Sequence, residues 1–165
     1  MKHILFTLFI TTVLSCQNRE ETQFSIEALN DDLINLQGDS VPFKSILEKH
    51  KGSTVLIDVW ASWCGDCIKG LPSVRNLQKE YPEVVFLFLS VDENKDAWRK
   101  GIERFQIKGA HYNLPKGMKT GEFVDFINLS WIPRYMVIDA QGKISLFKAT
   151  SASDSAIVEA LKLVI

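Results

Sequence analysis

The sequence has only three cysteines, which excludes the disulfide-rich scaffold of many small secreted domains. It also lacks an excess of charge, because 19 Lys and Arg residues are balanced by 20 Asp and Glu residues. This balance gives no electrostatic reason to expect binding to nucleic acid, to an anionic membrane surface or to phosphate groups. Glycine, proline and aromatic contents are ordinary, so the chain does not resemble a fibrous or disordered protein. A length of 165 residues suits one globular domain with a hydrophobic core.

No apolar run is long enough to span a bilayer as a helix, which takes about 20 residues. The longest candidate follows Lys2 and covers residues 4–14, and this length suits the apolar region of a secretory signal. The run leads into the small Ser15 and then Cys16. This junction resembles the bacterial lipoprotein signal, in which a peptidase cuts before a cysteine that carries lipid. We therefore predict a signal peptide over residues 1–15 and lipidation of Cys16.

A polar segment follows the predicted lipidation site. Residues 16–23 would form a tether between the lipid on Cys16 and a domain over residues 24–165. The expected location is the bacterial cell envelope, on the periplasmic side of the membrane that holds the lipid. The alternatives are a soluble protein secreted after ordinary cleavage, and an uncleaved anchor with an incidental cysteine.

The apolar periodicity of residues 24–165 predicts alternating strands and helices. The expected order of strands and helices implies an α/β fold with a mixed central sheet. The expected elements are two short strands around a turn within 24–36, a helix over 42–50, a buried strand over 54–61, an amphipathic helix over 65–80, a second buried strand over 84–91, a helix over 92–105, a mostly irregular segment over 106–121 with a possible strand at 110–114, a short helix over 122–129, a hairpin of 135–139 with 143–148, and a helix over 154–165.

The motif Cys64-x-x-Cys67 lies between the predicted strand 54–61 and the predicted helix 65–80. At such a junction the first thiol sits at a helix amino terminus, where free N–H groups and the macrodipole stabilise a thiolate. The second thiol lies one turn further on, close enough to form a disulfide. The pair can therefore cycle between dithiol and disulfide.

Two plainer interpretations of the cysteine pair remain open. It could form an inert structural disulfide, or it could be half of a zinc site. Zinc in structural sites takes four ligands, and the other candidates are Cys16, His50 and His111, all distant in sequence.

The segment 55–67 resembles the first core strand and redox motif of the thioredoxin superfamily. It is more similar to the extracytoplasmic, membrane-tethered branch that contains the TlpA and ResA thiol-disulfide oxidoreductases. Pro72 stands where the family kinks its active-site helix, and Ile132-Pro133 resembles the family's cis-proline loop. The resemblance covers residues 54–165, and residues 24–52 match the branch's amino-terminal extension less specifically.

The resemblance implies a thioredoxin-like fold with a mixed central sheet flanked by helices, an amino-terminal strand extension, and an insertion before the cis-proline loop. It implies that Cys64 is the nucleophile and that Cys67 resolves the mixed disulfide. Asp58 interrupts the apolar strand 54–61, so we expect it to be buried, and the resemblance suggests that its carboxylate accepts the proton of Cys67.

The remaining expectations concern ligands and partners. Trp63, Ile132 and Pro133 are expected to contact the substrate. The expected partners are proteins that carry disulfides or dithiols, together with an unidentified membrane electron donor. No metal and no organic cofactor is expected.

Four residues depart from the family pattern: Asp66, Gly70, Trp131 and Arg134. Glutamate is frequent in the branch at the position of Gly70, and a small residue at that of Trp131. The negative charge of Asp66 should raise the pKa of the Cys64 thiol and favour a reducing protein, whereas Arg134, if it came near, would act in the opposite direction.

We therefore expect a thiol-disulfide oxidoreductase that reduces disulfides of extracytoplasmic proteins. A disulfide oxidant on the same scaffold is one alternative. A carrier of copper(I), which favours thiolate ligands, is another. A peroxidase of the related peroxiredoxin group is disfavoured, because Ala61 stands where that chemistry needs threonine.

Overall fold

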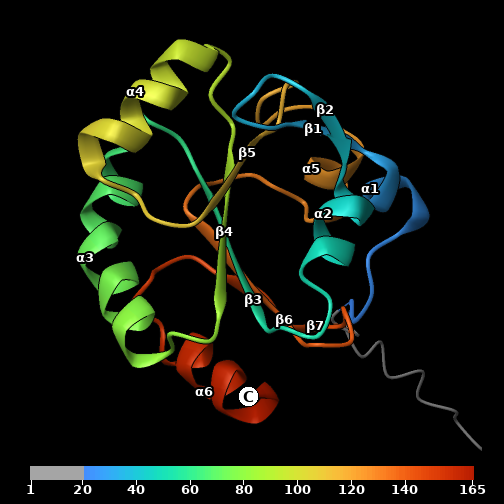
Figure 1. Cartoon of the computed structure of the whole chain (residues 1–165), viewed down its shortest axis with the longest axis vertical. Coiled ribbons are helices and arrows are strands. Elements are labelled where there is room, and N and C mark those ends of the chain that lie inside the picture. Colours follow the sequence, from blue (N-terminus) through green and yellow to red (C-terminus); the bar gives the residue numbers. More distant parts are fainter. Residues whose placement is uncertain (1–20) are drawn as a thin grey trace, which may run out of the picture.

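The computed structural model describes residues 21–165, so the predicted signal peptide, Cys16 and most of the predicted tether lie outside the described residues. Strands and helices largely alternate along this part of the chain (Figure 1). Their bounds are α1 Ile26–Asn30, β1 Asp32–Ile34, β2 Ser40–Pro42, α2 Phe43–Lys49, β3 Val55–Trp60, α3 Gly65–Glu80, β4 Val85–Ser90, α4 Lys95–Phe105, β5 Ala110–Asn113, α5 Glu122–Phe126, β6 Arg134–Ile138, β7 Ile144–Ala149 and α6 Ser155–Val164.

The strands form one mixed sheet in the order β2-β1-β5-β4-β3-β6-β7. β3 pairs with β4 in parallel, β4 pairs with β5 in parallel, and the remaining neighbours are antiparallel. Figure 1 shows α3 and α4 on one side of the sheet and α1, α2 and α5 on the other. Because helices cover both faces, the central strand β3 is buried along its whole length, including its one charged residue. The predicted thioredoxin-like fold is confirmed.

The prediction of two strands within residues 24–36 was wrong in its first half. Residues 26–30 form the helix α1, and only residues 32–34 form a strand. The Oγ of Ser25 accepts the Ala28 N–H at 3.1 Å, which satisfies a free donor of the first helical turn. This local cap outweighs a short apolar alternation that sequence pattern alone assigns to a strand.

The amino-terminal extension is attached to the segment that precedes the cis-proline loop. The buried carboxylate of Asp31 accepts the N–H of Phe123 at 3.0 Å, and Lys116 Nζ lies 3.5 Å from the same carboxylate. The aromatic rings of Phe43 and Phe123 pack edge to face with centroids 4.7 Å apart. These contacts hold the start of α5 against the amino-terminal extension.

Gly109 stands where β5 approaches β4 too closely for a side chain. Its φ is +151°, and a Cβ there would lie 2.5 Å from the carbonyl oxygen of Phe86 and 2.7 Å from the ring of Phe88. We expect Gly109→Ala to lower the free energy of unfolding by about 3 kcal/mol, because it adds a steric clash to a strained backbone. Urea unfolding followed by tryptophan fluorescence measures this loss.

The matched control is Gly38→Ala. Gly38 also has a positive φ, of +97°, but a Cβ there meets no atom within 4 Å. Only the backbone strain, about 1 kcal/mol, is expected. Equal losses for the two variants would contradict the steric explanation.

Candidate active site

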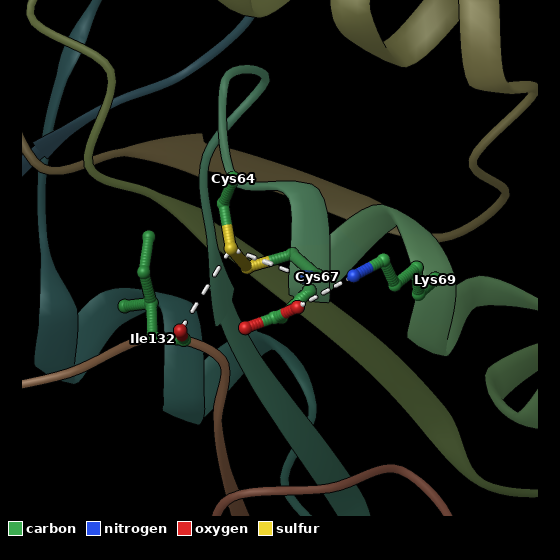
Figure 2. Close-up of polar contacts among 5 residues, drawn as sticks. Cys64, Cys67, Lys69 and Ile132 are labelled. Carbon is green, nitrogen blue, oxygen red and sulfur yellow. Dashed lines mark hydrogen bonds and ion pairs between the residues drawn. A yellow bond between two sulfur atoms is a disulfide. The ribbon is translucent and has the colours of Figure 1, made fainter.

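Cys64 and Cys67 form a disulfide at the amino terminus of α3. Cys64 is the N-cap residue, and the Cys67 N–H donates to its Sγ at 3.1 Å (Figure 2). The two side chains are only 6% and 3% exposed. In the dithiol form the same N–H and the helix dipole would stabilise a thiolate on Cys64. The helix α3 begins at Gly65 and ends at Glu80, as predicted.

The segment before β6 places a backbone acceptor beside the cysteines. The Ile132–Pro133 peptide bond is cis, and the carbonyl oxygen of Ile132 lies 3.8 Å from Cys64 Sγ. Figure 2 shows this carbonyl pointing toward the sulfur. In the disulfide form the sulfur carries no proton, so this contact is a close approach and not a donated hydrogen bond. Ile132 and Cys64 are therefore in contact, although they are 68 positions apart in the sequence.

Asp58 is buried beneath α3. It is 3% exposed, and its Oδ1 has no hydrogen-bond partner among the described residues. Burial raises the pKa of this carboxyl to about 8. A group that changes charge so near neutral pH is a candidate for proton transfer. The predicted burial is observed, while the proton-accepting role stays a prediction.

The relation of Asp58 to Cys67 follows from the sheet register. Asp58 is paired with Tyr135 of β6, so both side chains project from the same face of the sheet. The Tyr135 hydroxyl lies against Gly70 of α3, and Cys67 belongs to the buried stripe of the same helix. Asp58 and Cys67 therefore both lie in the interface between β3 and α3.

Tyr135 is a site residue that sequence reasoning missed. It is fully buried, and its hydroxyl has no partner among the described residues. Burial, together with the nearby charge of Asp58, raises the pKa of this phenol. A Cβ on Gly70 would lie only 3.2 Å from the hydroxyl, so Tyr135 occupies the space beside the position where glutamate is frequent in the branch.

Asp66 and Arg134 have less influence on the Cys64 thiol than the sequence led us to expect. Asp66 forms an exposed ion pair with Lys69, with Nζ 3.2 Å from the carboxylate (Figure 2), which reduces the negative charge presented to Cys64. The buried guanidinium of Arg134 donates to the carbonyl oxygen of Ile127 at 2.6 Å. The guanidinium of Arg134 is therefore directed at the end of α5. The expected effect of Arg134 on the Cys64 thiol, opposite to that of Asp66, does not arise through a direct contact.

Asp92 fixes the loop that carries Cys64, a role that the sequence did not reveal. Its buried carboxylate accepts the Ser62 N–H at 2.9 Å, the Ser62 hydroxyl at 2.7 Å and the Ser90 hydroxyl at 2.7 Å. Asp92 does not cap the following helix, because the side chain of Asn94 caps α4. The Asp92–Ser62 contact joins β4 to the loop after β3.

We expect Asp92→Ala to destabilise the protein by about 3 kcal/mol, because three donors to a charged acceptor lose their partner. Chemical unfolding measures this loss, and faster hydrogen exchange of the Ser62 amide would locate it in the loop. Asp96→Ala is the control, because Asp96 forms only an exposed ion pair with Arg99 and should cost about 0.5 kcal/mol or less. An unchanged Ser62 exchange rate would show that Asp92 does not hold the loop.

Within residues 21–165, none of the helices combines the length and the apolar composition needed to cross a bilayer. Nor do three or more His, Cys, Asp or Glu side chains in this part of the chain gather into a group that could hold a metal ion.

Comparison with known proteins identifies similar chains. The family model described as Thioredoxin-like matches residues 52–144. A thiol-disulfide oxidoreductase named ResA from Bacillus cereus is 25% identical over 155 residues, which cover 86% of this chain and 84% of the relative. A solution structure from Bacteroides vulgatus, provisionally described as a thiol-disulfide oxidoreductase, is 30% identical with a TM-score of 0.64, and the match covers 92% of this chain and 95% of that one. A secreted disulfide oxidoreductase of Mycobacterium tuberculosis shares the fold at 18% identity, with a TM-score of 0.61 and coverage of 84% and 98%.

Proposed function

Because the chain belongs to the thioredoxin-like family and is a thiol-disulfide oxidoreductase similar to TlpA and ResA, we propose that it reduces disulfides of extracytoplasmic proteins. The observation that carries this proposal is the position of Cys64, which caps α3 and faces the Ile132 carbonyl. Cys64, the proposed nucleophile, thus lies beside the carbonyl oxygen of Ile132, which can accept a hydrogen bond from the backbone of a bound peptide.

The reaction starts from the dithiol form of the protein. The Cys64 thiolate attacks one sulfur of the partner's disulfide, forms a mixed disulfide and releases the other partner sulfur as a thiolate. Cys67 then loses its proton to the Asp58 carboxylate and attacks Cys64 Sγ. This step releases the second partner thiolate and leaves the Cys64–Cys67 disulfide. Two electrons have passed from the cysteine pair to the partner.

The substrate is held by its backbone as well as by the sulfur. An extended segment of the partner can pair with the backbone at Ile132 and Pro133, as a short strand addition beside the cysteines. Trp63 contacts the same segment. The cysteine pair carries the electrons, so the reaction requires no metal and no organic cofactor.

The proposed setting is the bacterial cell envelope. Lipid on Cys16 would hold the protein at a membrane, and residues 16–23 would let the domain reach its partners outside the cytoplasm. The junction at Ser15-Cys16 supports this setting, and so does the secreted relative. A membrane dithiol donor would return the Cys64–Cys67 disulfide to the dithiol form. Metabolic labelling with a fatty acid, compared with a Cys16→Ser variant, tests the lipid.

The reduction potential of the cysteine pair tests the proposed direction. We expect equilibration with glutathione redox buffers to give a potential closer to that of thioredoxin, about −270 mV, than to that of the strong oxidant DsbA, about −120 mV. The physical reason is that no cationic side chain among the described residues lines the cleft at Cys64 to favour its thiolate strongly. A potential near −120 mV would instead establish a disulfide oxidant.

A further inference from the structure

A cleft of about 380 Å³ opens beside Cys64, and its walls are largely apolar. Trp63 and Trp131 line it and are 62% and 63% exposed. Met118, from the segment between β5 and α5, lines it too, and Asp66 and Ser130 supply polar groups. Large apolar side chains gathered around one cleft mark an interaction site, whereas scattered single ones do not.

The chemistry at Cys64 decides what enters this cleft. Cys64 and Ile132 both belong to its lining, so a sulfur that exchanges with Cys64 must arrive in the cleft itself. The covalent intermediate then keeps the neighbouring residues of the partner against Trp63 and Trp131. The cleft is therefore continuous with the substrate site and not a separate surface.

Strand geometry determines which partner residue meets the tryptophans. In an extended segment, side chains alternate between two faces, and residues two apart lie about 7 Å from each other on the same face. The substrate cysteine must point toward Cys64. Residues two positions before and after it point the same way, while its immediate neighbours point away from the cleft.

We propose that the cleft binds an apolar side chain located two residues from the substrate cysteine. The substrates are then proteins that present an extended segment with the pattern apolar-x-Cys or Cys-x-apolar. Trp131 and Met118 join Trp63 as specificity-determining residues. This inference rests on the proposed function and adds a substrate class to it.

Two peptides of identical composition provide the test. Both have one cysteine, two leucines and serines elsewhere, and each is supplied as its symmetrical disulfide. One places the leucines two residues from the cysteine, and the other places them directly beside it. The dithiol form of the protein donates two electrons and two protons, and each peptide disulfide becomes two peptide thiols. The second-order rate constant is measured under single-turnover conditions by rapid quenching and chromatography.

We expect the first peptide to react about tenfold faster than the second, since partial burial of two leucines supplies a preference of that size. In Trp131→Ala, the rate constants of the two peptides should differ by no more than about twofold. Trp131→Phe should restore most of the preference for the first peptide. The ratio does not change when a variant merely loses stability or thiol reactivity, because both peptides then slow equally. Leu163→Ala removes an exposed apolar side chain from α6, outside the cleft, and should keep the wild-type ratio.

The outcomes separate the inference from the proposed function. If both peptides react at equal rates, or if Trp131→Ala keeps the wild-type ratio, the cleft does not select an apolar residue, although disulfide reduction stands. If neither peptide reacts while the Cys64–Cys67 pair is fully reduced, both the inference and the proposed function fail.

Discussion

Replacing Cys67 with serine will convert the protein into a trap that accumulates mixed disulfides through Cys64. Cys64 can still attack a partner, because it caps α3 and lines the open cleft. The second attack, which normally releases the partner, needs the Cys67 sulfur that lies one turn further along the helix. Non-reducing gels and mass spectrometry of the material released by a reductant will identify the partners.

Cys64→Ser is the matched variant. Cys67 is buried against the sheet and is absent from the residues that line the cleft, so it cannot replace Cys64 as the first nucleophile. We expect the rate of disulfide reduction to fall at least about a thousandfold, and no partner to be trapped. Partners trapped by Cys67 in this variant would reverse the assigned order of the two cysteines.

Replacing Asp58 with asparagine should slow resolution of the mixed disulfide about 100-fold or more, because the group proposed to accept the Cys67 proton is lost. The first attack by Cys64 does not use this group, so the initial burst of mixed disulfide should keep its rate. Rapid quenching with a peptide disulfide separates the two steps. Slowing of the first step alone would contradict the assigned role.

The same variant should alter stability in a pH-dependent way. The folded-state pKa of Asp58 is about 8, whereas the unfolded chain ionises near the ordinary value of 3.8. Between these values the unfolded chain releases a proton that the folded protein retains, so the wild type loses stability as pH rises from about 4 to 8. The asparagine side chain does not ionise, so the variant does not have this pH-dependent loss of stability. The variant should therefore be more stable than the wild type by an amount on the order of 4 kcal/mol at pH 7, and by none near pH 3.

The groups that face Asp58 allow this pH dependence to be assigned. Phe88 and Tyr135 lie on either side of it in the sheet, and His111 stacks on Phe88 with ring centroids 5.2 Å apart. Burial lowers the pKa of His111 and raises that of Tyr135. Both groups are present in the wild type and in the variant, so their own titration cancels in the difference between the two proteins. Unfolding of the disulfide form removes the cysteines from the titration. A constant difference in stability between pH 4 and pH 8 would show that Asp58 does not titrate there.

Local sequence signals predicted the elements that carry the cysteines. The apolar run 54–61 predicted β3, and the amphipathic pattern of residues 65–80 predicted the bounds of α3, because each depends on residues close in the chain. The burial of Asp58 followed from its apolar neighbours. Residues 24–30 were mistaken for strand because a serine cap and an apolar alternation compete within one short segment.

The unpredicted contacts around the site, in contrast, all join segments that are distant in sequence. Asp58 meets Tyr135 through the register of β3 with β6, and Asp92 meets Ser62 across 30 residues of sequence. The direction of Arg134 depends on where α5 ends. A single sequence contains no record of which residues face each other across a sheet, so these partners could be found only in the folded structure.

The close approach of the Tyr135 hydroxyl to Gly70 limits how this protein can be recombined with its relatives. A chimera that imports an active-site helix with glutamate at position 70 would bring the new Cβ to 3.2 Å from the phenol hydroxyl, so Tyr135 would have to shift by a few tenths of an ångström. An exchange at position 70 should therefore be tolerated better when position 135 is exchanged with it.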